Sequence, residues 1–290
     1  MLPTLKEHQK NIFYMNKIYL ISIFFYFGCQ VSSNNDKWIN SLPKPANLTN
    51  EEFEVYLPQF QYKFPNYYDR IKAINKWRLN TPYGLFCLGE ERGIDKDPLI
   101  RHDSSDCTVH ILTTMAFAES SSYLEARNMI KKIHYKQNGK GVRNPSFNSR
   151  WHFTSDRILH HPKTIDITSK VANAESLETL DIELNKKENG DEFLDLNWTS
   201  KELIQFIPIE KINRGLLEKL PKSCGVAFVK RDYFKLGIVI AHEGFLIDNS
   251  RLFHASSEMG KTVEVDFLSY MKINKKYRFD GVMFYRLVEG

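Results

Sequence analysis

The chain has 290 residues, of which 42% are hydrophobic and 26% charged, so it can bury a sizeable core and is not intrinsically disordered. Its 40 basic and 35 acidic residues give a net charge of +5 and are interspersed along the chain, which argues against a nucleic-acid-binding surface. The four cysteines form no CxxC pair, which argues against a structural zinc site or a thioredoxin-type redox motif.

The amino end reads as a targeting segment. An apolar run at 18–27 follows Lys17; it is too short to span a bilayer, which takes about 20 residues, but matches the core of a secretory signal. Cys29 after a small residue resembles the lipidated cysteine of a bacterial lipoprotein; a plainly cleaved signal and an apolar helix of an intracellular protein are the alternatives. We therefore expect residues 1–29 to be a signal segment, with Met15 as an alternative start, and the protein to lie in the bacterial cell envelope, periplasmic or membrane-anchored.

A polar stretch with two prolines, 30–50, is expected to be a linker, and 51–290 to form the working domain. Apolar residues at helical spacing predict helices near 49–60, at 67–79 and, as one continuous helix, at 107–127.

The second half of the domain begins with 150–161, which fits a short strand or a helix. The acidic stretch 172–200 reads as a surface excursion. From Leu203 onward, short runs rich in Val, Ile and Phe alternate with turn residues, as in an antiparallel sheet. Helices followed by strands predict an α+β fold.

The first candidate for chemistry is Cys107, which follows Asp106, a favourable helix N-cap residue. A thiol attacks as the thiolate, and the first turn of a helix offers unpaired N–H groups and the positive end of the helix dipole. We therefore expect this position to lower the pKa of the thiol. A buried structural cysteine is the alternative.

A nucleophilic cysteine needs a base and a group that orients it. His242 and His254 stand 12 residues apart on two expected strands joined by a turn near 248–250. That spacing suits neighbouring positions on antiparallel strands. Either histidine alone could be an ordinary polar residue, but the cysteine and both histidines together indicate a nucleophilic site.

Several short motifs occur along the chain in an order that resembles a known family. "DCT" opens the cysteine helix, and "HEGF" and "HAS" carry the two histidines. "TPYG" precedes them, "SRWHFTSDRI" lies between cysteine and histidine, and "VEVDFLSYM" and "DGVMFYRL" close the chain. From about residue 70 to 290 the chain thus resembles the N-acetylmuramoyl-L-alanine amidase-like branch of the NlpC-type papain-like cell-wall cysteine peptidases.

The resemblance implies a papain-like α+β core with the cysteine helix packed on the antiparallel sheet. By position it makes Cys107 the nucleophile, His242 the general base and His254 the orienting residue. It places Tyr83 near bound peptide, and its R-x-H block assigns Arg150 and His152 to the substrate site.

Three residues depart from the family's pattern. His110 stands where an apolar or acidic residue is expected, Arg157 where tryptophan is usual, and Glu243 where valine follows the histidine. None removes a member of the triad, but they bear on substrate preference. His110 could line the cleft or be a buried, hydrogen-bonded ring.

The resemblance implies a hydrolase that cuts an amide bond of peptidoglycan or muropeptides, between N-acetylmuramic acid and L-alanine, through a thioester. A D-glutamyl–diaminopimelate endopeptidase and an inactive cell-wall-binding relative are alternatives, as is an acyltransferase or deamidase with the same triad. We expect no cofactor and no nucleic-acid partner, with membrane attachment only through a lipidated Cys29. We also expect no metal, because no suitably spaced carboxylate or cysteine accompanies His160–His161. Cys87 and Cys224 could pair, although burial as small hydrophobic residues is simpler.

Overall fold

The structure is a computed structural model that describes residues 34–290. The chain divides into a short unit ending at Pro43 and a main unit, Lys44–Gly290. In the first unit, 34–41 is helical, within the range for which the sequence predicts a linker. The expected signal segment and Cys29 lie outside the described residues. Among the residues described, no helix is both long and apolar enough to cross a membrane.

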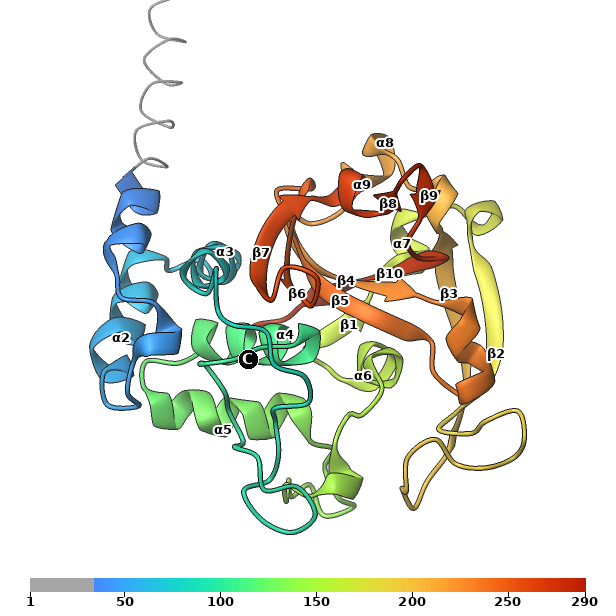
Figure 1. Cartoon of the computed structure of the whole chain (residues 1–290), viewed down its shortest axis with the longest axis horizontal. Coiled ribbons are helices and arrows are strands. Elements are labelled where there is room, and N and C mark those ends of the chain that lie inside the picture. The colour runs from blue at the N-terminus through green and yellow to red at the C-terminus, as the bar shows by residue number, and fades with distance from the viewer. Residues whose placement is uncertain (1–33) are drawn as a thin grey trace, which may run out of the picture. The chain divides into compact units, whose positions relative to one another are not determined.

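The first half of the main unit is helical (Figure 1). Its longer helices are α2 (Phe53–Lys63), α3 (Tyr67–Trp77), α4 (Cys107–Ala118) and α5 (Tyr123–His134). The single helix expected over 107–127 is therefore wrong. The chain breaks after Ala118, and α5 has a cap of its own, because the Ser122 side chain accepts a hydrogen bond from the Glu125 backbone N–H at 3.1 Å.

The second half forms an antiparallel sheet in the order β2-β3-β10-β4-β5-β6-β7, with β1 also paired to β10. The strands are β1 (Thr164–Asp166), β2 (Glu178–Leu184), β3 (Ser200–Pro208), β4 (Ser223–Val229), β5 (Ile240–Ile247), β6 (Arg251–Ser256), β7 (Lys261–Asp266) and β10 (Gly281–Leu287). A separate hairpin joins β8 (Lys272–Ile273) and β9 (Lys276–Tyr277).

Shorter helices connect these strands: α6 (Thr154–His160), α7 (Thr168–Val171), α8 (Arg214–Leu217) and α9 (Phe267–Tyr270). Short 3-10 helices lie at Pro45–Asn47, Phe147–Ser149, Ala174–Ser176, Ile209–Lys211 and Arg231–Leu236. The α+β class is confirmed. The expected surface excursion, 172–200, contributes β2, which pairs along its whole length with β3.

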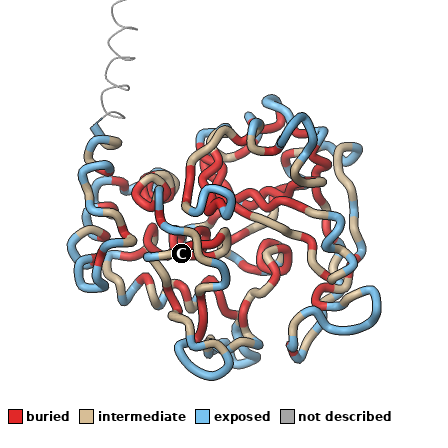
Figure 2. The backbone as a smooth tube through the Cα atoms, in the orientation of Figure 1, coloured by how far each residue is buried: buried red, intermediate tan, exposed pale blue. Residues whose placement is uncertain are grey.

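Helix α4 lies at the centre of the main unit, packed against α3, α5, β5 and β6 (Figure 1). Every residue from Val109 to Ala118 is buried, as are most of the central strands (Figure 2). Only the first two residues of the helix, Cys107 and Thr108, are partly exposed. The fold therefore hides the body of α4 and leaves its amino end accessible.

Candidate active site

A cavity of about 860 Å³ opens at the amino end of α4. Its lining includes five of the residues that the sequence singled out: Cys107, His242, Tyr83, Arg150 and His152. The structure thus brings together segments from the helical half, the connecting loops and the sheet. The remaining candidate, His254, is buried and bonded to His242.

Asp106 fixes the start of the cysteine helix with both of its carboxylate oxygens. Oδ1 accepts a hydrogen bond from the Val109 N–H at 2.8 Å, which is the expected helix cap. Oδ2 accepts one from the Phe86 N–H at 2.9 Å. Phe86 has a φ of +53°, which is unfavourable for an aromatic residue, and its ring is 79% exposed beside the cavity. One carboxylate therefore holds both the start of α4 at Cys107 and the loop that carries Phe86.

The environment of Cys107 raises the pKa of its thiol to about 12, mainly through desolvation and then through the charges of Asp106 and Glu243. The Glu243 backbone N–H and the Thr108 side chain lower this pKa, but by less. The expectation of a lowered thiol pKa is therefore wrong. A helix amino end favours the thiolate, but here burial and two neighbouring carboxylates outweigh it.

The two histidines meet as their spacing predicted. His242 Nε2 lies 2.9 Å from His254 Nδ1. The register pairs Phe245 of β5 with Phe253 of β6, which puts both imidazoles on the same face as diagonal neighbours. The pairing of β5 with β4 is irregular next to His242, where Ala241 is an extra residue. Because of this bulge, three successive residues, 240–242, line the cavity.

Both imidazoles are neutral near pH 7. Desolvation, followed by the neighbouring His254 and Arg278, lowers the pKa of His242 to about 3. Desolvation likewise lowers the pKa of His254 to about 4. The ring of Tyr270 lies 4.5 Å from that of His254. Tyr270 lies in the motif "VEVDFLSYM", but nothing in that motif indicates that its ring packs against His254.

Two of the other predicted site residues, Arg150 and His152, have their polar groups engaged by the protein. Arg150 binds Glu90, and its Nη2 lies 2.8 Å from Asp95 Oδ2. The ring of His152 bonds the Phe147 carbonyl through Nε2 at 2.6 Å, and desolvation lowers its pKa to about 4. Tyr83 is only partly buried, and desolvation followed by the nearby Cys107 raises its pKa.

Two of the three residues that depart from the family's pattern bind each other. Arg157 Nη2 lies 2.5 Å from Glu243 Oε2, and both side chains are buried. Oε2 also accepts a hydrogen bond from the Tyr285 hydroxyl at 2.9 Å, and Oε1 accepts from Thr108 at 3.1 Å. Each residue is unusual in the sequence, but nothing there indicates their pairing, because they lie 86 positions apart.

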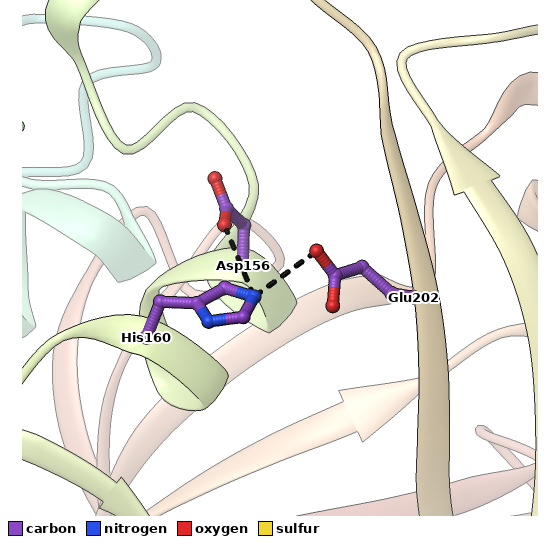
Figure 3. Close-up of side chains that lie close together, drawn as sticks. All are labelled: Asp156, His160 and Glu202. Atoms are coloured by element: carbon purple, nitrogen blue, oxygen red, sulfur yellow. Dashed lines mark hydrogen bonds and ion pairs between the residues drawn. The ribbon is translucent and has the colours of Figure 1, made fainter.

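A second polar cluster joins α6 to β3 (Figure 3). His160 Nε2 lies 3.0 Å from Glu202 Oε1 and 3.9 Å from Asp156 Oδ1. The expectation that no suitably spaced carboxylate accompanies His160 is therefore wrong: Asp156 stands one helical turn before it, and β3 adds Glu202. Lys136 Nζ is already 2.6 Å from Asp156 Oδ2, and the Ser200 hydroxyl donates to Glu202 at 2.5 Å. We interpret the cluster as an ion-pair network that ties the two elements together.

His110 fits neither of its expected roles. Its ring is buried and does not line the cavity, so it does not face substrate. Neither ring nitrogen has a hydrogen-bond partner among residues 34–290, and the ring packs edge-on against Phe245 with centroids 5.6 Å apart. Cys87 and Cys224 are both free thiols: Cys87 lines the cavity, whereas Cys224 is buried in the core of the sheet.

Residues 73–280 match the model of a family described as AmiA-like, N-acetylmuramoyl-L-alanine amidase-like. A comparison with curated protein sequences gave no match.

Among solved structures, a Legionella pneumophila protein is similar with a TM-score of 0.65 and 22% identity, over 82% of this chain and 95% of that one. An N-acetylmuramoyl-L-alanine amidase from Bacteroides uniformis is similar with a TM-score of 0.58 and 20% identity, over 77% of this chain and 99% of that one. At these identities the two likenesses show a shared fold.

Proposed function

Because the chain belongs to the N-acetylmuramoyl-L-alanine amidase-like family, we propose that it is a cysteine hydrolase that cuts peptidoglycan or its fragments between N-acetylmuramic acid and L-alanine. The observation that carries the mechanism is the convergence of Cys107 and His242 on one cavity, with His254 bonded behind the base. These three groups supply a nucleophile, a base and an orienting partner.

The hydrogen bond between the two histidines supports a separate role for each ring nitrogen of His242. His242 Nε2 is bonded to His254, so Nδ1 is left to take the proton of Cys107. The sulfur attacks the amide carbonyl carbon, and the tetrahedral intermediate collapses as His242 returns the proton to the departing L-alanine nitrogen. Water, activated by the same base, then hydrolyses the thioester and frees the thiol.

The pKa values of Cys107 and His242 favour a state in which both side chains are neutral before the reaction begins. With the thiol pKa at about 12 and that of His242 at about 3, neither group is charged at pH 7. The proton must therefore move as the sulfur attacks, so His242 acts as a general base in that step. In this proposal the backbone N–H of Cys107, in the first turn of α4, can stabilise the developing oxyanion.

The charge of the cavity lining favours cleavage of the amide between the sugar and L-alanine over cleavage of the bond between D-glutamate and diaminopimelate. Arg150 is the only arginine or lysine in the described lining, and Glu90 and Asp95 already bind it. The alternative bond, between D-glutamate and diaminopimelate, is flanked by substrate carboxylates that need a cation. The muramyl–alanine amide lies next to an uncharged sugar, which suits an aromatic lining that includes Phe86, Trp151 and Tyr233.

Mass spectrometry of defined muropeptides tests the proposal. We expect the wild-type protein to release the intact stem peptide with a free L-alanine amino end. Cys107→Ala should lower the rate by at least about 10³-fold, because it removes the nucleophile. Release by Cys107→Ala at the wild-type rate would contradict the cysteine mechanism. Cleavage after D-glutamate would select the alternative bond, and binding without cleavage would indicate an inactive relative.

A further inference from the structure

Side chains from three elements, α4, α6 and β10, converge on the carboxylate of Glu243. The residue lies on β5 and is fully buried. Its oxygens bind Arg157 of α6, Tyr285 of β10, Thr108 of α4 and, at 3.3 Å, the Thr154 hydroxyl at the start of α6. A buried carboxylate is costly unless it is paired and hydrogen-bonded, and this one has four donors.

Glu243 is connected to both His242 and Cys107. Glu243 directly follows His242, and Thr108 directly follows Cys107. The Glu243 side chain accepts a hydrogen bond from the Thr108 hydroxyl at 3.1 Å, and the Glu243 backbone N–H is near enough to the Cys107 sulfur to lower the pKa of that thiol. Movement of Glu243 would therefore change the position of the sulfur relative to the base.

We propose that the buried Glu243–Arg157 ion pair positions the Cys107 nucleophile: it fixes the first turn of α4 against β5, and Arg157 offsets the negative charge that Glu243 brings beside the sulfur. This inference rests on the proposed function, since it concerns the same thiol. Neither residue touches substrate in this role, so both are positioning residues.

The titratable groups around the thiol come from several elements. Asp106 faces it from the start of α4, Glu243 from β5, Tyr83 from the loop before α4 and Tyr270 from α9. His242 lines the same cavity and is neutral near pH 7. Arg157 and Tyr285 face the carboxylate of Glu243. Arg157 is the cation paired with that carboxylate, so its removal should expose the sulfur to an uncompensated negative charge.

Opposite single substitutions separate positioning from mere structural support. Arg157→Met leaves the carboxylate uncompensated, which raises the thiol pKa, whereas Glu243→Gln leaves the guanidinium, which lowers it. We expect iodoacetamide to alkylate Cys107 about tenfold more slowly in the first variant and about tenfold faster in the second, as for a pKa change of about one unit. The double variant, Arg157→Met with Glu243→Gln, should lie within about threefold of wild type. Mass spectrometry of the Cys107 peptide at pH 8 excludes signal from Cys87.

A second buried ion pair provides the control. Lys163 binds Glu119 at the opposite end of α4, and both side chains are largely buried. Lys163→Met should lower Tm without changing the alkylation rate of Cys107. If Arg157→Met and Glu243→Gln change the alkylation rate in the same direction, or leave it unchanged, the proposal is overturned.

Charge-conserving variants cover the case in which a single substitution prevents folding. Arg157→Lys and Glu243→Asp keep both charges but change the length of the bridge. Each should lower kcat on muropeptides by about tenfold with Tm within a few degrees of wild type, and an unchanged kcat would overturn the proposal. Wild-type and Cys107→Ala hydrolysis are measured alongside. If wild type does not hydrolyse muropeptides, the proposed function fails; if it does and the alkylation pattern is missing, only the positioning role fails.

Discussion

At the residue scale, His110 is a polar side chain whose surroundings among the described residues offer it no hydrogen-bond partner. It is buried against Phe245, and neither nitrogen is bonded within the described chain. Desolvation lowers its pKa well below the usual value. A buried polar group without a partner costs about 1–3 kcal/mol.

Replacement of this ring by an apolar side chain should therefore stabilise the protein. We expect His110→Leu to raise the free energy of unfolding by about 1 kcal/mol, with kcat and the choice of muropeptide unchanged because the ring does not line the cavity. Denaturant unfolding and product analysis measure the two effects. A marked loss of stability, or a change in the cleaved bond, would contradict this interpretation of His110.

Which single residues could be predicted depended on how local their signals were. Cys107 follows a capping aspartate, and His242 and His254 are separated by one hairpin, so short stretches of sequence indicated each feature, whereas only the family resemblance joined the cysteine to the histidines. The ion pair of Arg157 with Glu243 depends on tertiary packing. The sequence marked both residues as unusual, but nothing local to either one indicates the other.

At the scale of elements, Asp106 caps the amino end of α4. Asp106→Asn keeps an acceptor for the Val109 N–H but turns an amide donor toward the Phe86 N–H. We expect the free energy of unfolding to fall by about 1 kcal/mol. Alkylation of Cys107 should become several-fold faster, because a negative charge that raises the thiol pKa is gone.

A neighbouring aspartate gives the matched control for this element. Asp103 lies in the same loop, but its side chain is half exposed and pairs with Arg101. Asp103→Asn should leave both unfolding and alkylation close to wild type, because solvent screens the lost charge. If the two asparagine variants alkylate equally fast, Asp106 does not tune the thiol.

Element boundaries were harder to predict than element types. The periodic apolar face runs on from α4 toward α5, so the pattern gave one helix where the structure has two. Three serines at 120–122 carried the missing signal, since Ser122 caps α5. The α+β class was predicted because Val- and Ile-rich runs with turns dominate the end of the chain, whereas the pairing order depends on contacts distant in sequence.

At the scale of the whole molecule, many histidines are neutral in the folded state. Burial lowers the pKa of seven in the described chain: His102, His110, His134, His152, His161, His242 and His254. The unfolded chain binds protons at these sites below about pH 6.5, while the folded chain does not. The free energy of unfolding should therefore decrease as the pH is lowered below about 6.5.

We expect the free energy of unfolding to drop between pH 7 and pH 5, by up to about 1.4 kcal/mol per pH unit for each such histidine. Asp106, Asp156 and Asp166, whose pKa values are raised by burial, offset part of this at the acidic end. Urea unfolding at several pH values measures the slope. His110→Leu should make the slope shallower, and constant stability from pH 7 to pH 5 would contradict the prediction.

The position of β10 has a consequence for how the chain is made. It follows every other strand in the sequence, yet it lies between β3 and β4 and also holds β1. On a ribosome, the strands before it emerge with two central edges still open, and such edges favour aggregation. The sheet, and with it the cavity beside His242, can close only after 281–287 has emerged. The protein should therefore become active late and in one step, and any delay at that point exposes the chain to misassembly.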